Sequence, residues 1–301
     1  MKKLEAAGRP KNGATIVRIG TSDTYHRDSD IIGLEIEIVG KELEFCITAG
    51  KDRITLADIV PLSRILSAEI TAAVLENIHA GGDYVPCTKG CSACCGPYLV
   101  PLSVPEAFRL HQDVAVTKRH YRDLFWRGCL HATRRILDSV SRERPPLNAT
   151  DLKLIAGWYR SLRLTCPFLC NHECLIYEQR PLACREYFVK GSAGVCRGQP
   201  DTAEVVKLPV QMPNVLAQLS SELEETSTEA MMLPVALVWC EENADRAAQT
   251  WPGAMMVERF VEIVRAAVSK KPSAIAEQGG AIIGISRMRR QANRLCRSLS
   301  G

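Results

Sequence analysis

The distribution of cysteine constrains this chain more than any other feature of its sequence. Of 13 cysteines in 301 residues, ten fall between Cys87 and Cys196. Where thiols are kept reduced, clustered cysteines are typical of metal sites, whereas disulfide frameworks need an oxidising compartment. The first twenty residues contain charges but no apolar run of the roughly 7 to 15 residues found in a secretory signal. We therefore expect a cytoplasmic protein whose clustered cysteines bind metal.

The composition is that of an ordinary folded protein. Hydrophobic residues make up 46% of the chain and charged residues 24%, which disfavours collagen-like, disordered and coiled-coil structures. The net charge of +4 is too small to argue for nucleic acid as a partner. The longest apolar run, Met231 to Cys240, is half a membrane span and contains a proline, so we expect no transmembrane helix.

Residues 1–82 are expected to form a β-hairpin followed by a helix. Apolar residues alternate with polar or small ones from Ile32 to Ile38, and the alternation resumes from Leu43 to Ile47. A period of two on both sides of a short turn is typical of a hairpin with one apolar face. From Pro61 the apolar spacing changes to three and four residues, and it stops at Gly81-Gly82. This spacing predicts a helix that covers the hairpin.

Residues 83–200 contain the ten clustered cysteines and are expected to form a loop-rich lobe. The segment Ser103–Glu106 has the pattern of a capping box and predicts a short helix. A longer helix is expected from about Thr117 to Val140, and another around Leu154–Leu162. Because Cys129 follows the apolar period of the long helix, we interpret it as a core residue and not as a metal ligand.

Residues 201–301 are expected to be helical. The apolar pattern predicts helices over 212–225, 235–248 and 255–268. The arginine-rich segment from Arg287 to Arg297 is interpreted as a solvated helix or tail, with contact to nucleic acid or anionic lipid as the alternative. The predicted fold is therefore mainly α-helical, with an N-terminal β-hairpin and a central loop-rich cysteine lobe that binds metal.

Two cysteine motifs carry the chemistry. A metal tetrahedron needs sulfur atoms within roughly 4 Å of one another, which close spacing in a turn with glycine can achieve. Adjacent Cys94 and Cys95 diverge, so they suit two metals or two faces of one cluster. The second motif follows about 70 residues later. The eight candidate ligands are Cys87, Cys91, Cys94 and Cys95 in the first motif, then Cys166, Cys174, Cys184 and Cys196.

Two arginines flank the candidate ligand Cys184. Pro181 is placed to begin a short helix with Cys184 in its first turn, where the helix dipole favours a thiolate. Four thiolates around one Zn²⁺ or one [4Fe-4S]²⁺ cluster leave a net charge of −2. We therefore predict that Arg180 and Arg185 bind the cofactor by stabilising that charge.

With both motifs in this order, the chain resembles the CxxCxxCC, or YkgJ-like, cysteine-cluster proteins. The resemblance rests on CTKGCSACC and CPFLCNHECLIYEQRPLACREYF and covers about residues 87–197. That family is described as zinc- or iron-chelating and includes the flagellin lysine methylases. The resemblance to those methylases implies an iron-sulfur centre and group transfer to protein lysines.

Two features depart from the family pattern. The gap between Cys87 and Cys91 is three residues instead of two. Cys170 is additional to the pattern, and we interpret it as a free thiol or as a neighbour of the ligands. His172 could supply a nitrogen ligand, but we expect a solvent-exposed loop residue there.

The leading hypothesis is a metal-binding protein that chelates a [4Fe-4S] cluster or zinc and supports redox or methyl-transfer chemistry. The alternative is a structural zinc module, in which eight thiolates and two Zn²⁺ ions form a closed site that presents a surface to a protein partner. The expected partners are thus the metal ion or cluster and a partner or substrate protein. The sequence shows no glycine-rich nucleotide loop and no nucleophilic triad, so it does not decide whether the protein is an enzyme.

Overall fold

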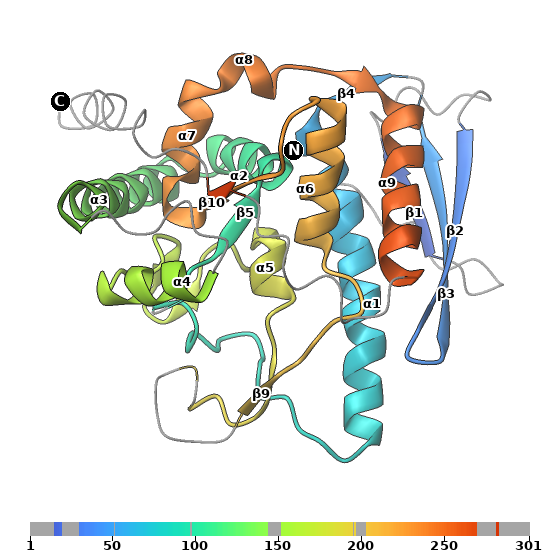
Figure 1. Cartoon of the computed structure of the whole chain (residues 1–301), viewed down its shortest axis with the longest axis horizontal. Coiled ribbons are helices and arrows are strands. Elements are labelled where there is room, and N and C mark those ends of the chain that lie inside the picture. The colour runs from blue at the N-terminus through green and yellow to red at the C-terminus, as the bar shows by residue number, and fades with distance from the viewer. Residues whose placement is uncertain are drawn as a thin grey trace.

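Helices dominate the protein, and a small β-sheet forms one side of it (Figure 1). This arrangement confirms a mainly α fold with an N-terminal β-hairpin. None of the described helices is both long enough and apolar enough to span a bilayer. The computed structural model describes residues 15–19, 30–50, 52–96, 98–143, 152–194, 196, 203–269 and 281–282.

The predicted hairpin is part of a three-stranded sheet. Strands β2 (Asp30–Ile38) and β3 (Lys41–Ala49) pair antiparallel, as the alternation predicts. Val39 and Gly40 join them with φ angles of 49° and 80°, the conformation of the two-residue turns that match strand twist. A further strand, β1 (Thr15–Ile19), pairs parallel to β3 and gives the order β1-β3-β2. The alternation did not predict this third strand.

Two helices cover the apolar face of the sheet. The first, α1 (Val60–Ala80), has the predicted bounds and follows the 3₁₀ turn η1 (Leu56–Ile59). The second, α9 (Gly253–Ser269), contacts β2 and β3 (Figure 1). Gly253 is required where α9 begins, because a Cβ there would lie 2.8 Å from the backbone oxygen of Asp52. Strands β4 (Arg53–Ile54) and β11 (Trp251–Pro252) pair at this point.

The centre of the molecule is built on α2 (Val104–Ala115). Its capping box is formed as predicted, with Ser103 and Glu106 bonded to each other. The short strand β5 (Pro101–Ser103) leads into α2 and pairs antiparallel with β10 (Glu229–Met232), which also pairs with β12 (Ala281–Ile282).

Helix α3 (Arg119–Glu143) corresponds to the predicted long helix. Cys129 is fully buried on its inner face, so the interpretation of this thiol as a core residue is confirmed. Helix α4 (Leu152–Ser161) follows and packs against α3, with the indole nitrogen of Trp158 donating to the Ser139 hydroxyl at 3.0 Å.

The C-terminal helices largely follow the prediction. Helix α6 (Met212–Leu223) matches, but the helix expected over 235–248 is divided into α7 (Ala236–Glu242) and α8 (Ala244–Ala247). Asn243 causes the break, because its side-chain amide donates to the Trp239 carbonyl at 2.8 Å and so competes with the next helical turn. The arginine-rich segment 287–297 lies outside the described residues.

In the described part of residues 162–205, which contains the second cysteine motif, the helices and strands are all short. They are β6 (Leu169–Cys170), β7 (Glu173–Cys174), the 3₁₀ turn η2 (Tyr177–Gln179), α5 (Leu182–Arg185), β8 (Val189–Gly191) and β9 (Ala203–Val205). The division of the chain at residues 82 and 200 stays a prediction.

Candidate metal centre

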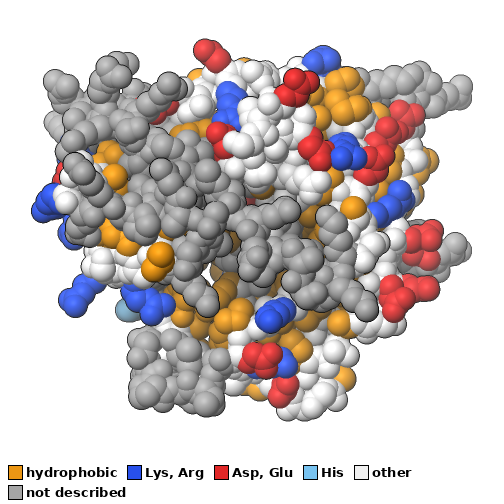
Figure 2. Space-filling model, viewed as in Figure 1, with side chains coloured by type: hydrophobic (Ala, Val, Ile, Leu, Met, Phe, Trp, Pro, Cys, Tyr) orange, Lys and Arg blue, Asp and Glu red, His pale blue; other side chains and the backbone are white. Residues whose placement is uncertain are grey.

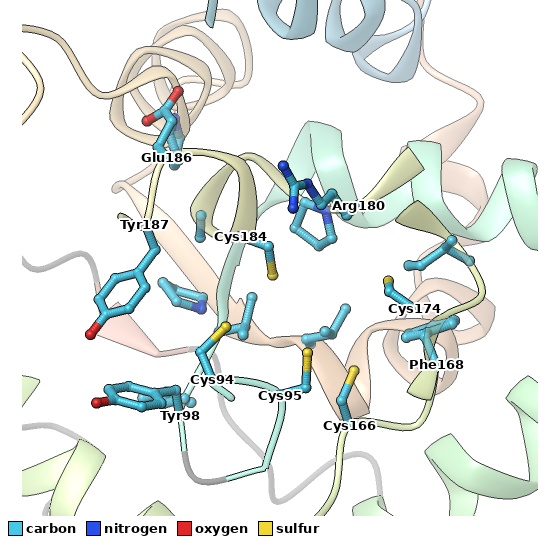
Figure 3. A pocket seen from close by; sticks show the side chains of 18 of the residues that line it. Cys94, Cys95, Tyr98, Cys166, Phe168, Cys174, Arg180, Cys184, Glu186 and Tyr187 are labelled. Atoms are coloured by element: carbon cyan, nitrogen blue, oxygen red, sulfur yellow. The ribbon is translucent and has the colours of Figure 1, made fainter. Parts of the chain in front are cut away.

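The two cysteine motifs meet in space. The backbone N–H of Cys166 donates a 2.9 Å hydrogen bond to the carbonyl of Cys95, across about 70 residues of sequence. Thiols from both motifs line one cavity of about 390 Å³. Figure 3 shows the sulfur atoms pointing into this shared space, with Cys184 facing the others from the opposite side. The cavity-lining cysteines are Cys91, Cys94, Cys95, Cys166, Cys174 and Cys184.

The first motif folds as two successive turns. Cys91 N–H bonds to the Thr88 carbonyl at 3.1 Å, and Cys95 N–H bonds to the Ser92 carbonyl at 3.0 Å. Gly90 has a φ of 92°, which only glycine adopts at low cost, so the first turn depends on it. The turns bring Cys94 and Cys95 side by side at the cavity wall.

The second motif begins against helix α3. Phe168 is fully buried, and the centroid of its ring lies 5.0 Å from the ring centroid of Phe125. Gly128 permits the close approach, since a Cβ there would lie 3.0 Å from the Cβ of Pro167. These two contacts fix the backbone directly after Cys166.

A tight hairpin places Cys174 at the cavity. Strands β6 and β7 pair antiparallel, with Leu169 opposite Cys174. Both residues at the tip, Asn171 and His172, have positive φ. The tip directs His172 into solvent, which confirms its interpretation as an exposed loop residue. Cys170 is half-buried but is not among the residues that line the cavity.

The short helix α5 carries Cys184. Pro181 precedes it, and its carbonyl accepts the Cys184 N–H at 3.0 Å, as predicted from the sequence. The N–H of Leu182, the first residue of α5, donates to the buried carboxylate of Glu106 at 2.7 Å. Helix α2 therefore sets the position of the turn that presents Cys184.

The two predicted cofactor arginines occupy different places. Among the described residues that line the cavity, Arg180 is the one Arg or Lys, and its guanidinium lies 4.2 Å from the ring centroid of Tyr177. Arg185 is not in the lining. Its Nε donates to the Arg180 carbonyl at 3.1 Å and its Nη2 to the carbonyl of Glu178, so it organises the η2 turn.

Cys87 and Cys196 stand apart from the cavity lining. Cys196 is buried and Cys87 half-buried. Burial raises the pKa of the Cys87 thiol, and the nearby thiols of Cys91 and Cys196 raise it further. Cys87 and Cys196 therefore lie beside the cavity-lining Cys91 but outside the cavity lining itself.

Burial keeps most of the cavity thiols protonated. It raises the pKa of Cys166 to about 12, and it raises the pKa of Cys174 and Cys184 as well. For Cys94 the hydrogen bond with the Cys95 thiol is the first cause of the raised pKa, and burial adds to it. Arg180 acts in the opposite direction on Cys94, Cys174 and Cys184, because a positive charge stabilises a thiolate.

The remaining walls of the cavity were not predicted from the sequence. Tyr98 and Tyr187 form an aromatic pair with ring centroids 5.3 Å apart. The carboxylate of Glu186 accepts the N–H of Met212, at the start of α6, at 3.2 Å and the hydroxyl of Ser67, in α1, at 2.7 Å. Contacts between segments far apart in the sequence bring these side chains to the cavity, so no local pattern could have indicated them.

Loop-presented thiols from two distant segments, converging on one cavity, define a cysteine-cluster domain. Residues 86–205 match the family model CxxCxxCC, described as "Putative zinc- or iron-chelating domain". This part of the chain is therefore similar to the CxxCxxCC family, and the match supports the resemblance that its two motifs indicated. The comparisons with curated proteins and with solved structures give no match.

Proposed function

We propose that the cavity thiols hold an iron-sulfur cluster, and that the protein carries out redox chemistry on a ligand that enters the same cavity. The observation that carries the proposal is the one-sided arrangement of the thiols. They line part of a cavity of about 390 Å³, and much of the remaining wall is aromatic or apolar. A structural zinc site is closed by its four ligands and leaves no such space beside it.

The spacing of the thiols favours a cluster over a single ion. Four thiolates around one Zn²⁺, at Zn–S distances of about 2.3 Å, bring their sulfur atoms within about 4 Å of one another. Among the described residues, no three Cys, His, Asp or Glu side chains stand together in a way that would hold one ion. A [4Fe-4S] cluster binds each thiolate to a different iron, so its ligands lie further apart.

The donor set fits such a cluster. Cys166, Cys174 and Cys184 supply three ligands, and the adjacent Cys94 and Cys95 are both placed to supply the fourth. Thiolates are the usual ligands of iron-sulfur clusters, and a bound cluster exchanges single electrons. Arg180 would offset part of the negative charge of the four thiolates.

The raised pKa values mean that deprotonating these buried thiols is unfavourable in the metal-free protein. A bound metal would stabilise the thiolates and offset that free energy. Cys166, Cys174 and Cys184 remain protonated at neutral pH in the metal-free protein. Loading the site therefore releases protons, and we expect it to become more favourable as the pH rises.

Tyr98 and Tyr187 would bound the ligand space next to the cluster. Burial raises the pKa of Tyr187, and the hydrogen bond that its hydroxyl donates to Tyr98 raises it further. Tyr187 therefore stays neutral at physiological pH, and the pair offers hydroxyl groups and ring faces to a ligand.

Anaerobic purification with iron, sulfide and zinc analysis tests the proposal. We expect brown protein with visible absorption and an electron paramagnetic resonance signal after reduction. Cys184→Ser should reduce iron and sulfide together, whereas Cys129→Ala, at the buried thiol of α3, should leave both unchanged. Colourless protein with about two zinc ions per chain would overturn the proposal in favour of a structural zinc module.

A further inference from the structure

The outer face of α3 carries a band of positive charge that the described part of the protein does not neutralise. His131 and three arginines, Arg127, Arg134 and Arg135, are exposed and recur at three- and four-residue spacing, so they form one stripe along the helix. None of the three arginines makes an ion pair with a described residue. By contrast, Arg246 pairs with Glu224 and Glu229 at 2.6 and 2.7 Å.

The neighbouring segment extends this band toward the cavity. The contacts of Trp158 with Ser139 and of Pro167 with Gly128 show that the chain from α4 onwards runs antiparallel to α3. Arg163 lies between these two contacts in the sequence and is exposed. We call the set Arg127, His131, Arg134, Arg135, Arg160 and Arg163 the basic band.

Arg160 joins the basic band to the cavity wall. Its guanidinium lies 5.4 Å from the ring centroid of Tyr98, which lines the cavity. Figure 2 shows Lys and Arg side chains at the edge where Figure 1 places α3 and α4, whereas Asp and Glu gather at the opposite edge, over the sheet.

Apolar side chains continue the stripe at the N-terminal end of α3. Leu124 is 43% exposed and Tyr121 38% exposed, and Val116 just before the helix is 69% exposed. Leu124 stands three residues before Arg127, on the same face. Tyr and Arg are both enriched at protein interfaces, and Leu124 adds an exposed apolar side chain beside them. A site that stacks nucleic-acid bases would favour exposed aromatic rings along the band, whereas two of these three apolar neighbours, Val116 and Leu124, are aliphatic.

We propose that this face of α3, the basic band together with Leu124, docks an acidic segment of a partner protein. Carboxylates of the partner would neutralise the band, and an apolar side chain of the partner would cover Leu124. The proposal goes beyond the metal centre and does not depend on which metal that centre holds.

Fluorescence anisotropy on the full chain tests the docking face. The probes are a labelled peptide with Glu at most positions and Leu at every third or fourth, a poly-L-glutamate peptide and a single-stranded oligonucleotide. We expect the Glu/Leu peptide to bind, and Arg127→Glu/Arg134→Glu to weaken its binding at least ~tenfold. Leu124→Ser should also weaken it. Raising the salt from ~0.05 to ~0.15 M should weaken it as well, because the Debye length shortens.

The matched control is Lys41→Glu/Lys207→Glu, which changes the net charge by the same amount at exposed positions away from α3. Binding by this control should equal that of the unmodified protein, and the metal content of every variant should be unchanged. Equal binding by the α3 variant and the control would overturn the proposal. The proposal would also be overturned if the oligonucleotide bound more tightly than the Glu/Leu peptide and this binding depended on the basic band. A third contrary outcome is that poly-L-glutamate binds as tightly as the Glu/Leu peptide and Leu124→Ser has no effect.

Discussion

The carboxylate of Glu106 accepts a 2.7 Å hydrogen bond from the backbone N–H of Leu182, 76 residues further along the chain. Glu106 also accepts a 2.9 Å hydrogen bond from the Ser103 hydroxyl. One buried side chain therefore caps α2 and holds the start of α5. Since α5 presents Cys184, the position of a candidate ligand depends on a helix cap outside both cysteine motifs.

Replacing Glu106 with Ala should destabilise the protein and loosen the metal site together. The change leaves the buried N–H of Leu182 without its acceptor, which costs about 2 kcal/mol. We expect the free energy of unfolding of the metal-free protein, measured in urea, to fall by about that amount. The metal content per chain should fall as well. Glu44→Ala, on an exposed strand position, is the control and should change neither quantity.

Glu106 also predicts a pH dependence of stability. Burial raises its pKa above the ordinary value of 4.5, so the folded state holds this proton to a higher pH than the unfolded state. The stabilising contribution is therefore complete below about pH 4.5 and is lost as the pH rises through the folded-state pKa. Each fully coupled proton gives a slope of about 1.4 kcal/mol per pH unit.

Urea unfolding of metal-free protein across this range measures the slope. Glu106→Gln should flatten it, while Glu186, whose pKa burial raises to about 8, retains part of it. An unchanged slope in Glu106→Gln would show that the Glu106 carboxyl does not titrate in the way its burial implies.

The contact between Gly128 and Pro167 should be intolerant of a side chain. Gly128→Val would push the loop away from α3 and shift Cys166, so we expect the metal content to fall by roughly half or more. Gly157→Val is the matched control, since nothing lies within 4 Å of a Cβ at that helical glycine. Equal metal content in both variants would mean that this contact does not position Cys166.

Arg180 should tune the reduction potential of the proposed cluster. Its positive charge at the cavity favours the more negative, reduced state, so Arg180→Gln should lower the potential by on the order of 50 mV. A redox titration followed by electron paramagnetic resonance measures the shift. Arg185→Gln removes a charge that is not in the cavity lining, and its potential should stay closer to that of the unmodified protein. A larger shift in Arg185→Gln would contradict this assignment.

Local periodicity predicted most of the fold. The hairpin, α1 and α3 follow from apolar spacing, since each buries one face along its own length. Strand β1 was missed because its parallel pairing with β3 joins separate segments and leaves no local turn signal. The break at Asn243 depends on one side-chain hydrogen bond, which spacing does not reveal.

The motifs identified the segments of the candidate site but not its shape. They indicated that the regions of Cys94 and Cys166 meet, and the structure brings both to one cavity. They could not separate Cys87 and Cys196 from the cavity thiols, because residue spacing does not determine which way a loop side chain points. The places of Tyr187 and Glu106 depend on contacts with residues far away in the sequence, Tyr98 and Leu182, and the only local signal for either was the capping box of Glu106.

The hydrogen bond between Cys166 and Cys95 has a consequence for biosynthesis. When a nascent chain has left the ribosome only as far as Cys95, it contains the thiols of the first motif, but the cavity has not yet formed. Helices α2, α3 and α4 must emerge and fold before the second group of thiols can arrive. Metal that arrives before Cys184 has emerged would therefore meet an incomplete binding site, and this topology favours delivery after both cysteine motifs have left the ribosome.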